Sequence, residues 1–302
     1  MTIRIVFMGS PDFAVPALRA LAAHYFVCGV VTQPDRPSGR GMTLSPPPVK
    51  VAALELGLPV FQPEKLRTPE AVQPLIDWAP DLIVVAAFGQ ILRANVLDLP
   101  RYGCVNIHAS LLPRHRGAAP IQAAILAGDA ETGVTIMKMD VGLDTGPMIR
   151  RRSIPIEKQD TGGSLFEKLS RLGGELLLET LPPYLAGEIQ PEPQPVEGVS
   201  YFGMIKKEDG LLAFTSTAQE LERRVRAFSP WPGTSMPWNG GPLKIQRAHV
   251  VDGRAGVGER LVVDGLPAVG CAAGLLVLDE LQPAGKKPML GKAFLSGYSK
   301  DW

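Results

Sequence analysis

Two polar side chains stand two residues apart in an apolar segment of the chain. Asn106 and His108 alternate with Val105 and Ile107, so in an extended strand both polar groups point to the same face. A carboxamide donates hydrogen bonds, and an imidazole takes up and releases protons near neutral pH. Together they could stabilise an oxyanion and move a proton. An isolated pair of this kind more often only hydrogen-bonds a neighbouring loop, so a third group is needed.

A carboxylate that could complete the group lies downstream, in the segment Asp-Val-Gly-Leu-Asp-Thr-Gly-Pro at 140–147. This density of glycine and aspartate excludes a helix and indicates a turn between two strands. Asp144 could orient the imidazole of His108 and raise its pKa. An aspartate in such a turn more often only closes the turn, so Asp144 is a catalytic candidate only in combination with His108.

The segments around these residues predict a parallel sheet. Short strands that are apolar throughout alternate with segments of helical spacing, which is typical of a parallel sheet with helices on both faces. We expect a doubly wound, mostly parallel α/β domain of the Rossmann type. Ligands of such sheets bind beyond the carboxyl ends of the strands, where His108 falls. The expected strands are 3–8, 26–31, 82–86, 104–108, 134–139 and 148–156, and the expected helices are 13–21, 49–56, 69–78, 118–126 and 165–185.

A change in composition after residue 187 indicates a second domain. Pro191, Pro193 and Pro195 alternate with other residues, which favours an extended connector over a packed element. We expect a catalytic domain at 1–187, a linker at 188–203 and a C-terminal domain at 204–302. Short β-like segments broken by glycine and proline predict a small β-barrel (OB-like) C-terminal domain. Its helix is expected at 217–228 and its strands at 243–250, 259–263, 268–272 and 275–281.

The composition indicates an ordinary globular protein. Of 302 residues, 45% are hydrophobic and 20% are charged, and the net charge is +1, so nucleic-acid binding would have to rest on a local patch. Cys28, Cys104 and Cys271 lack paired spacing, and the four histidines lack ligand spacing, so we expect neither a disulfide framework nor a metal site. Neither a signal peptide nor a membrane span is expected. We expect a monomer in the reducing cytoplasm.

The segment between His108 and Asp144 makes the pattern specific. Asn-x-His is followed by Ser-Leu-Leu-Pro at 110–113, Arg-Gly-Ala-Ala-Pro-Ile at 116–121 and Gly-Leu-Asp-Thr-Gly at 142–146. This combination resembles the formyltransferases that use 10-formyltetrahydrofolate. The resemblance implies that Asn106, His108 and Asp144 are the catalytic residues. It also implies binding of the folate co-substrate by Ser110, Leu111, Leu112, Pro113, Phe88, Gly89, Gln90, Leu92, Asp140 and Gly142.

Formyl transfer makes two chemical demands on such a site. As an amine attacks the formyl carbon, the carbonyl oxygen gains negative charge that hydrogen-bond donors can stabilise. We expect Asn106 and a protonated His108 to be these donors, with Asp144 holding the imidazole. The proton of the amine would leave through Asp144, His108 or an ordered water.

The acceptor of the formyl group is indicated outside this core. Residues 32–41, Thr-Gln-Pro-Asp-Arg-Pro-Ser-Gly-Arg-Gly, form a long, basic, irregular segment that resembles the acceptor-stem loop of methionyl-tRNA formyltransferases. The likeness covers nearly the whole chain, although Met42 and Thr43 depart from it where some relatives carry lysines. It implies initiator methionyl-tRNA as the acceptor and N-formylmethionyl-tRNA, used in translation initiation, as the product. RNA contacts are then expected from Arg36, Arg40, Lys206 and Lys207.

Three alternatives stay open from the residues alone. A formyltransferase of an amino-sugar nucleotide would share the catalytic core and have a similar second domain, but should lack the loop at 32–41. A hydrolase would pass the formyl group to water. A binding module would hold folate or RNA without chemistry, and the intact catalytic residues weigh against it.

Overall fold

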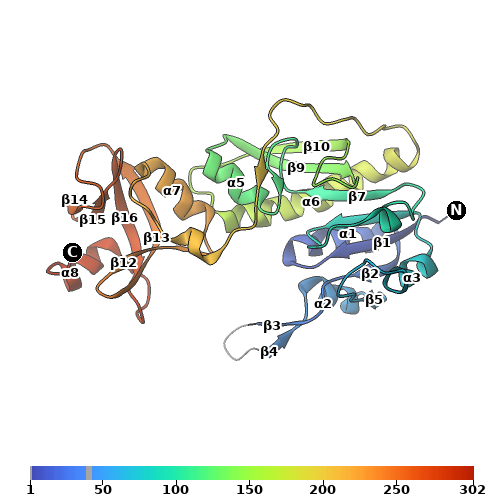
Figure 1. Ribbon diagram of the computed structural model, residues 1–302, viewed down its shortest axis with the longest axis horizontal. Helices are drawn as coiled ribbons and strands as arrows, with labels where there is room; N and C mark the ends of the chain where they lie inside the picture. Colours follow the sequence, from blue (N-terminus) through green and yellow to red (C-terminus); the bar gives the residue numbers. More distant parts are fainter. Residues whose placement is uncertain (1, 39–42) are drawn as a thin grey trace. The chain divides into compact units, whose positions relative to one another are not determined.

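The computed structural model describes residues 2–38 and 43–302 of the chain, and these fall into two compact units (Figure 1). Each unit has its own main sheet. The domain bounds expected at 187 and 204 stay a prediction. Unit 1 consists of Met1–Pro120, Glu131–Pro155 and Phe166–Phe202, and unit 2 of Ile121–Ala130, Ile156–Leu165 and Gly203–Trp302.

The main sheet of unit 1 has seven strands. They are β1 (Arg4–Gly9), β2 (Phe26–Val31), β5 (Val60–Phe61), β6 (Leu82–Ala86), β7 (Cys104–His108), β9 (Glu131–Lys138) and β10 (Met148–Pro155). Their order across the sheet is β10-β9-β7-β6-β1-β2-β5. The strands from β5 to β7 are parallel, whereas β9 is antiparallel to β7 and β10 to β9. The doubly wound, mostly parallel sheet predicted from the sequence is confirmed.

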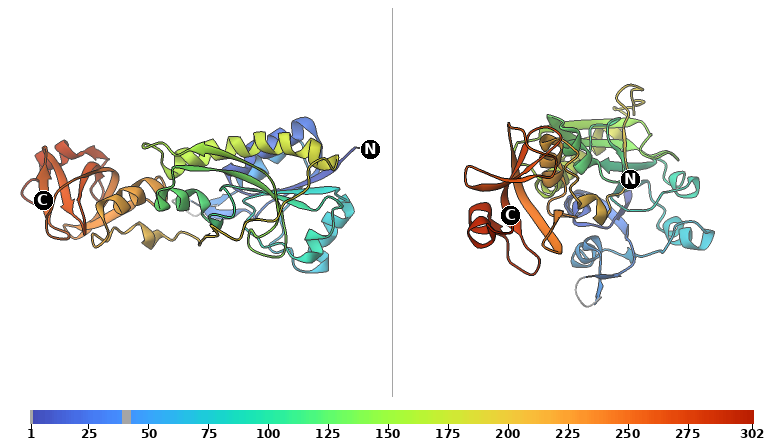
Figure 2. Two further views of the ribbon diagram at one scale, coloured as in Figure 1. Left: turned by 90° about the horizontal axis from the view of Figure 1, so that it is seen from above. Right: turned by 60° about the vertical axis from the view of Figure 1, so that its left-hand side comes forward.

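Helices cover both faces of this sheet (Figures 1 and 2). They include α1 (Val15–His24), α2 (Pro48–Glu55), α3 (Pro69–Trp78), α4 (Ala94–Leu97) and the long α6 (Gly162–Leu185). Cys104 of β7 packs in a core cluster with residues of α3 and α4. On the other face α6 approaches β7 so closely that a Cβ at Gly173 would lie 2.7 Å from Cγ2 of Ile107. Because residues of a strand alternate between faces, Asn106 and His108 share the face of Cys104.

The segment predicted as an irregular basic loop carries a short hairpin. β3 (Arg36–Ser38) pairs antiparallel with β4 (Thr43–Ser45), and residues 39–42, including Arg40, lie outside the described residues. At the base of the hairpin, Asp35 accepts hydrogen bonds from Lys50 and Gln62 at 2.8 Å. These two contacts hold the pKa of Asp35 below its ordinary value.

The proline-rich segment, expected as an extended connector and not as a packed element, belongs to unit 1 and pairs with other parts of this unit at several points. Glu192 forms a β-bridge with Met148. Further along, β11 (Tyr201–Phe202) pairs in parallel with β8 (Arg116–Gly117). The segment is extended, as predicted, but it packs against the part of the chain that follows His108.

Unit 2 is built on antiparallel strands in the order β12-β13-β16-β15-β14, with β17 paired to β16. Together with α7 (Ala218–Ala227) and α8 (Gly291–Tyr298) they enclose a core that includes Leu221, Leu278 and Phe294. The small β-barrel (OB-like) domain expected here is confirmed as a C-terminal domain of antiparallel strands. The strands are β12 (Thr234–Trp238), β13 (Gly241–Val251), β14 (Arg260–Val263), β15 (Leu266–Gly270), β16 (Leu275–Gln282) and β17 (Met289–Leu290), and unit 2 also contains most of α5 (Pro120–Ala127).

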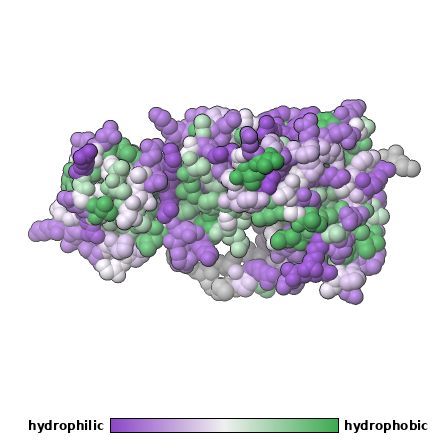
Figure 3. Space-filling model, turned by 45° about the horizontal axis from the view of Figure 1, so that its top comes forward, coloured by the Kyte–Doolittle hydropathy of each residue, from purple (hydrophilic) through white to green (hydrophobic). Residues whose placement is uncertain are grey.

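The face drawn in Figure 3 is mostly hydrophilic, with separate apolar patches. Within the described residues no helix is long and apolar enough to cross a membrane. Cys28, Cys104 and Cys271 are buried free thiols.

Candidate active site

His108 ends β7, and its imidazole is buried. Nε2 lies 3.1 Å from the backbone oxygen of His115. Because a carbonyl oxygen only accepts hydrogen bonds, Nε2 carries a proton, and in the neutral ring Nδ1 is bare. Nδ1 lies 3.8 Å from Oδ2 of Asp144. The structure thus brings together two of the residues predicted to be catalytic.

Burial and charge act in opposite directions on His108. Removal of the ring from water lowers its pKa, and this effect outweighs the nearby carboxylate of Asp144, which favours the imidazolium. The hydrogen bond to the backbone oxygen of His115 also raises the pKa, whereas the electrostatic effects of the His115 and Arg116 side chains lower it. Asp144 acts in the direction expected from the sequence, but the net shift is downward. The structure therefore favours a neutral resting imidazole.

Asp144 lies in the loop between β9 and β10 with a left-handed backbone, φ +53°. Its Oδ2 accepts a hydrogen bond of 2.8 Å from the amide of Gly117. The same segment that binds His108 through the oxygen of His115 thus binds Asp144 through the amide of Gly117. These three consecutive residues, 115–117, are the template that sets the imidazole against the carboxylate.

Asn106 lies on the same face of β7 as His108 and is half-buried. Across the described part of the chain its side chain makes no hydrogen bond and belongs to no ion pair. A half-buried carboxamide that the protein leaves without a partner is available to a substrate.

The segment 110–113, predicted to bind folate, forms a buried turn after β7. The hydroxyl of Ser110 donates to the oxygen of Arg114 at 2.6 Å. The hydroxyl of Thr135 donates to the oxygen of Ser110 at 2.7 Å and accepts from the amide of Leu112 at 3.1 Å. Leu112 is fully buried, Pro113 is buried and Leu111 is half-buried. The contacts observed shape the turn, and the role in folate binding stays a prediction.

The segment after β6 was also predicted to bind folate. Phe88 and Leu92 pack in the core of unit 1, and Gln90 is bonded to the backbone of Leu66 and Pro63. Gly89 is exposed, with φ +80°. The side chains of Phe88 and Leu92 therefore point into the core and away from the surface, and the role of this segment in folate binding stays a prediction.

Asp140 and Gly142 close the loop that carries Asp144. Oδ1 of Asp140 accepts from the amide of Gly142 at 3.0 Å and from the hydroxyl of Thr145 at 2.7 Å. A Cβ at Gly142 would lie 1.9 Å from that hydroxyl, so a side chain there would displace the Thr145 hydroxyl from Asp140. Both residues hold the loop in shape, and direct contact with folate stays a prediction.

The cations predicted to contact RNA lie in both units. Arg36 is exposed and forms an ion pair of 2.7 Å with Glu64. Lys206 and Lys207 are exposed at the start of a short 3-10 helix, Lys207–Gly210, next to Glu208 and Asp209. Arg40 lies outside the described residues, so its position is not part of the site.

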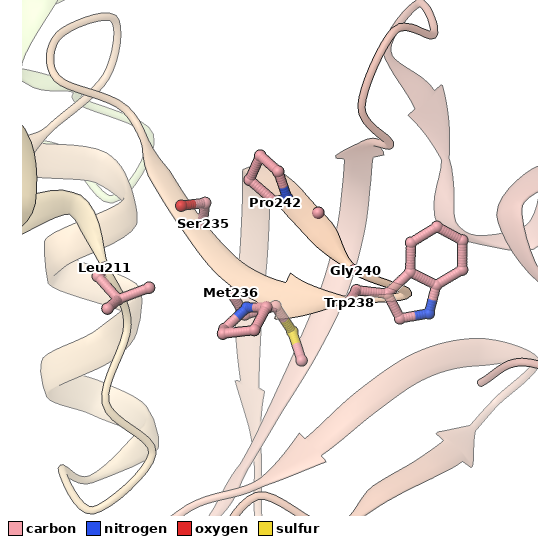
Figure 4. Close-up of a pocket in the computed structure, with 8 residues that line it drawn as sticks. Leu211, Ser235, Met236, Trp238, Gly240 and Pro242 are labelled. Atoms are coloured by element: carbon pink, nitrogen blue, oxygen red, sulfur yellow. The ribbon is translucent and has the colours of Figure 1, made fainter.

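An open pocket of about 300 Å³ lies in unit 2. Figure 4 shows Leu211, Met236, Trp238 and Pro242 among the residues around it, with Ser235 as a polar neighbour. None of the side chains that line it titrates, so the pocket offers no acid or base for proton transfer. In the part of the chain that the structure describes, no group of histidine, cysteine and acidic residues could hold a metal ion.

Sequence reasoning missed the residues that support the catalytic candidates. Gln194 and Arg116 are joined by hydrogen bonds beside Asp144. The apolar side chains of Ile91, Val141 and Leu143 are exposed. The signal for Val141 and Leu143 was available in the sequence, since a core does not need apolar residues in a glycine-rich turn. Nothing in the local sequence marks Gln194.

Both units match models of known protein families. Residues 3–181 match the Formyl transferase family, and residues 204–299 match the family described as Formyl transferase, C-terminal domain. The chain therefore belongs to the formyl transferase family, and the resemblance found in the sequence is confirmed.

Relatives within the family are similar over nearly their full length. The chain is 52% identical to the methionyl-tRNA formyltransferase of Myxococcus xanthus, across 98% of this chain and 95% of that one. It is 51% identical to the methionyl-tRNA formyltransferase of Halorhodospira halophila, across 98% and 97% of the two chains.

Solved structures share the fold at low sequence identity. The N-formyltransferase of Helicobacter canadensis, in complex with folinic acid and dTDP-3-aminofucose, has a TM-score of 0.68 at 19% identity, covering 92% of this chain and 99% of that one. HypX from Aquifex aeolicus, in complex with tetrahydrofolic acid, has a TM-score of 0.60 at 17% identity, covering 98% and 47% of the two chains.

Proposed function

We propose that the protein transfers the formyl group of 10-formyltetrahydrofolate to the amino group of methionine on initiator methionyl-tRNA, giving N-formylmethionyl-tRNA for translation initiation. The observation that carries the chemistry is the template 115–117, which sets His108 against Asp144 at the end of the strand that also presents Asn106. The identity of about half of all residues with methionyl-tRNA formyltransferases supports the choice of acceptor.

The carbonyl oxygen of the formyl group is stabilised by Asn106. When the amino nitrogen attacks the formyl carbon, a C–N bond forms and the oxygen becomes negatively charged. The carboxamide of Asn106, to which no described protein group is bonded, donates to this oxygen, and a donor in a partly buried site is worth more there than in water. Because no described protein group is bonded to this side chain, the new bond breaks no hydrogen bond within the described part of the protein.

The proton of the amine passes to His108. Its bare Nδ1 accepts the proton, directly or through an ordered water, and the imidazolium that forms lies 3.8 Å from the carboxylate of Asp144. Asp144 thereby offsets part of the cost of a buried positive charge. When the bond from the formyl carbon to N10 of the folate breaks, the proton passes to N10. The products are tetrahydrofolate and the formylated amine, and His108 is again neutral.

The formyl donor, 10-formyltetrahydrofolate, contacts exposed apolar side chains in two loops of unit 1. Ile91 follows β6, the strand next to β7, and Val141 and Leu143 lie in the loop of Asp144. Flat aromatic rings such as those of a folate gain binding energy from apolar contacts of this kind. The predicted folate residues of segments 88–92 and 140–142 lie in the same two loops as these apolar groups, and those of 110–113 form the turn that follows His108.

The acceptor RNA meets exposed cations. Arg36 in the hairpin, Arg40 beyond the described residues, and Lys206 and Lys207 in unit 2 can contact phosphates, which positions a nucleic acid without reading its sequence. We further propose that the protein works as a monomer in the reducing cytoplasm, where its three free thiols stay reduced.

One assay separates the candidate acceptors. The protein is incubated with 10-formyltetrahydrofolate and with either methionyl-tRNA, a nucleotide-linked amino sugar or no acceptor, and the products are identified by mass spectrometry. Formylated methionyl-tRNA is the expected product. Formylation of the sugar alone, or free formate without an acceptor, would refute the proposal.

A further inference from the structure

Gln194, in the proline-rich segment, is bonded directly to the loop that carries Asp144. Its side-chain Nε2 donates to the backbone oxygens of Asp144 and of Gly146, each at 2.8 Å. The two oxygens lie on either side of Thr145, so a single carboxamide spans the turn. Two sets of hydrogen bonds therefore hold the loop: those that the Asp140 side chain accepts within it, and those that Gln194 donates to its backbone.

The other end of the same carboxamide is held by Arg116. Oε1 of Gln194 accepts from Nη2 of Arg116 at 2.8 Å and from Nε at 3.1 Å. All four hydrogen-bonding positions of the carboxamide are therefore used. Its orientation is fixed as well, because the guanidinium of Arg116 cannot accept a hydrogen bond and the two backbone oxygens cannot donate one.

Arg116 is itself the middle residue of the template 115–117. Its side chain is buried and also donates to the hydroxyl of Tyr201 at 2.9 Å, and its amide donates to the oxygen of Ser200 at 2.9 Å. A Cβ at Gly117 would lie 2.4 Å from the oxygen of Phe202. The backbone of the 200–202 segment thus lies directly on the template.

We propose that Gln194 is a positioning residue of the active site: by joining the loop of Asp144 to Arg116, it holds the carboxylate at its distance from His108. This inference rests on the proposed formyl transfer. Gln194 touches neither His108 nor any reacting atom, so it acts through Asp144. The proline-rich segment is then part of the catalytic structure as well as the connection to unit 2.

Two substitutions test the inference against one control. Gln194→Glu keeps the length of the side chain and its contact with Arg116, but places an acceptor against two backbone oxygens. Gln194→Ala removes all four hydrogen bonds. The control is Gln190→Ala, because Gln190 lies in the same segment and bonds the nearby oxygen of Gly187.

The rate readout separates positioning from binding. Both Gln194 variants are expected to lower kcat by roughly 10-fold to 100-fold, the scale on which a displacement of about 1 Å acts, with KM for both substrates close to that of the parent. Gln190→Ala should retain the parent kcat. A kcat equal to that of the parent in both Gln194 variants would overturn the inference.

A second readout does not depend on the proposed function. The titration of the His108 imidazole is followed by NMR; the charged or titratable groups that act on it are Asp144, His115 and Arg116. If Gln194→Ala lets the carboxylate of Asp144 move away from His108, the midpoint of the His108 titration should move to lower pH, toward the midpoint measured in Asp144→Asn, because Asp144 favours the imidazolium. An unchanged midpoint overturns the inference whatever the rate. A parent protein that formylates no methionyl-tRNA refutes the proposed function, while the titration still decides whether Gln194 positions Asp144.

Discussion

The carboxylate Oδ2 of Asp144 lies 3.8 Å from Nδ1 of His108. At this distance opposite charges attract, but no hydrogen bond forms. Neither side chain depends on the other for its position, because His108 is bonded to the oxygen of His115 and Asp144 to the amide of Gly117. Hydrogen bonds to the backbone of residues 115 and 117 therefore orient both side chains, and Nδ1 of His108 is left free to accept a proton.

The pH dependence of formylation should follow the imidazole. His108 must be neutral to accept a proton, and burial lowers its pKa, so its limb in the pH profile should lie below the ordinary histidine value of about 6.5. A separate limb at about pH 8 is expected from protonation of the attacking α-amino group of methionine. Asp144 favours the imidazolium, so Asp144→Asn should move the His108 limb to still lower pH and reduce the maximum by roughly 100-fold. Rates measured from pH 5 to 9 check both points. A lower limb that stays at the same pH in Asp144→Asn would contradict its assignment to His108.

Truncation of Asn106 should remove an oxyanion donor without damaging the fold. Asn106→Ala is expected to lower kcat by roughly 100-fold. The free energy of unfolding should change little, because the side chain makes no hydrogen bond in the described structure. Asn95→Ala is the matched control, since Asn95 is exposed on α4. If the Asn106 variant kept the parent kcat, the oxyanion role would be wrong.

The parts of this fold and site that can be predicted from the sequence are those that depend on a pattern within one short segment. Strands 26–31 and 82–86 agree with β2 and β6, because strands buried on both faces are apolar throughout. Strand 104–108 agrees with β7, in which two polar residues alternate with apolar ones. The alternation in β7 placed Asn106 and His108 on one face. β12 and α8 were missed, since Pro237 interrupts the first and small residues blur the helical spacing of the second.

Gly117 should tolerate no side chain. Gly117→Ala forces a Cβ to within 2.4 Å of the oxygen of Phe202 at a φ of +108°, and the amide that binds Asp144 must shift. Gly198→Ala is the control, because its φ is +77° with open space around it; it should cost only the roughly 1–2 kcal/mol of a left-handed backbone. Urea unfolding should show a larger loss for Gly117→Ala, accompanied by a fall in kcat. Equal losses for both variants would mean that the contact with Phe202 is not tight.

Release of Arg36 should strengthen RNA binding. Glu64 competes with phosphates for the guanidinium, so Glu64→Gln should lower KM for methionyl-tRNA at low salt by up to about fivefold, the equivalent of an exposed ion pair. The gain should shrink as salt is added. Glu55→Gln is the control, because Glu55 pairs with Arg19 on the surface of unit 1. A KM that rises in Glu64→Gln would show that the pair helps to present Arg36.

The contacts that complete the site could not be predicted, because they join distant parts of the chain. The template 115–117 acts through backbone groups, which carry no sequence signal, and Gln194 lies 50 residues after Asp144 in a segment whose prolines suggest a free connector. The net pKa shift of His108 also depends on burial, which only the folded structure reveals. The side chains proposed to do the chemistry could be named from the sequence, whereas the groups that position them could not.

The most direct test of the proposed mechanism is a single-turnover measurement with His108→Ala. Saturating 10-formyltetrahydrofolate and enzyme in excess over methionyl-tRNA isolate the transfer step from binding and release. Loss of the proton acceptor should lower the rate constant for N-formylmethionyl-tRNA formation by roughly 100-fold or more, while His24→Ala, which changes an exposed histidine of α1, should leave it unchanged. A rate constant for His108→Ala close to that of the parent would contradict the role of His108 as the proton acceptor.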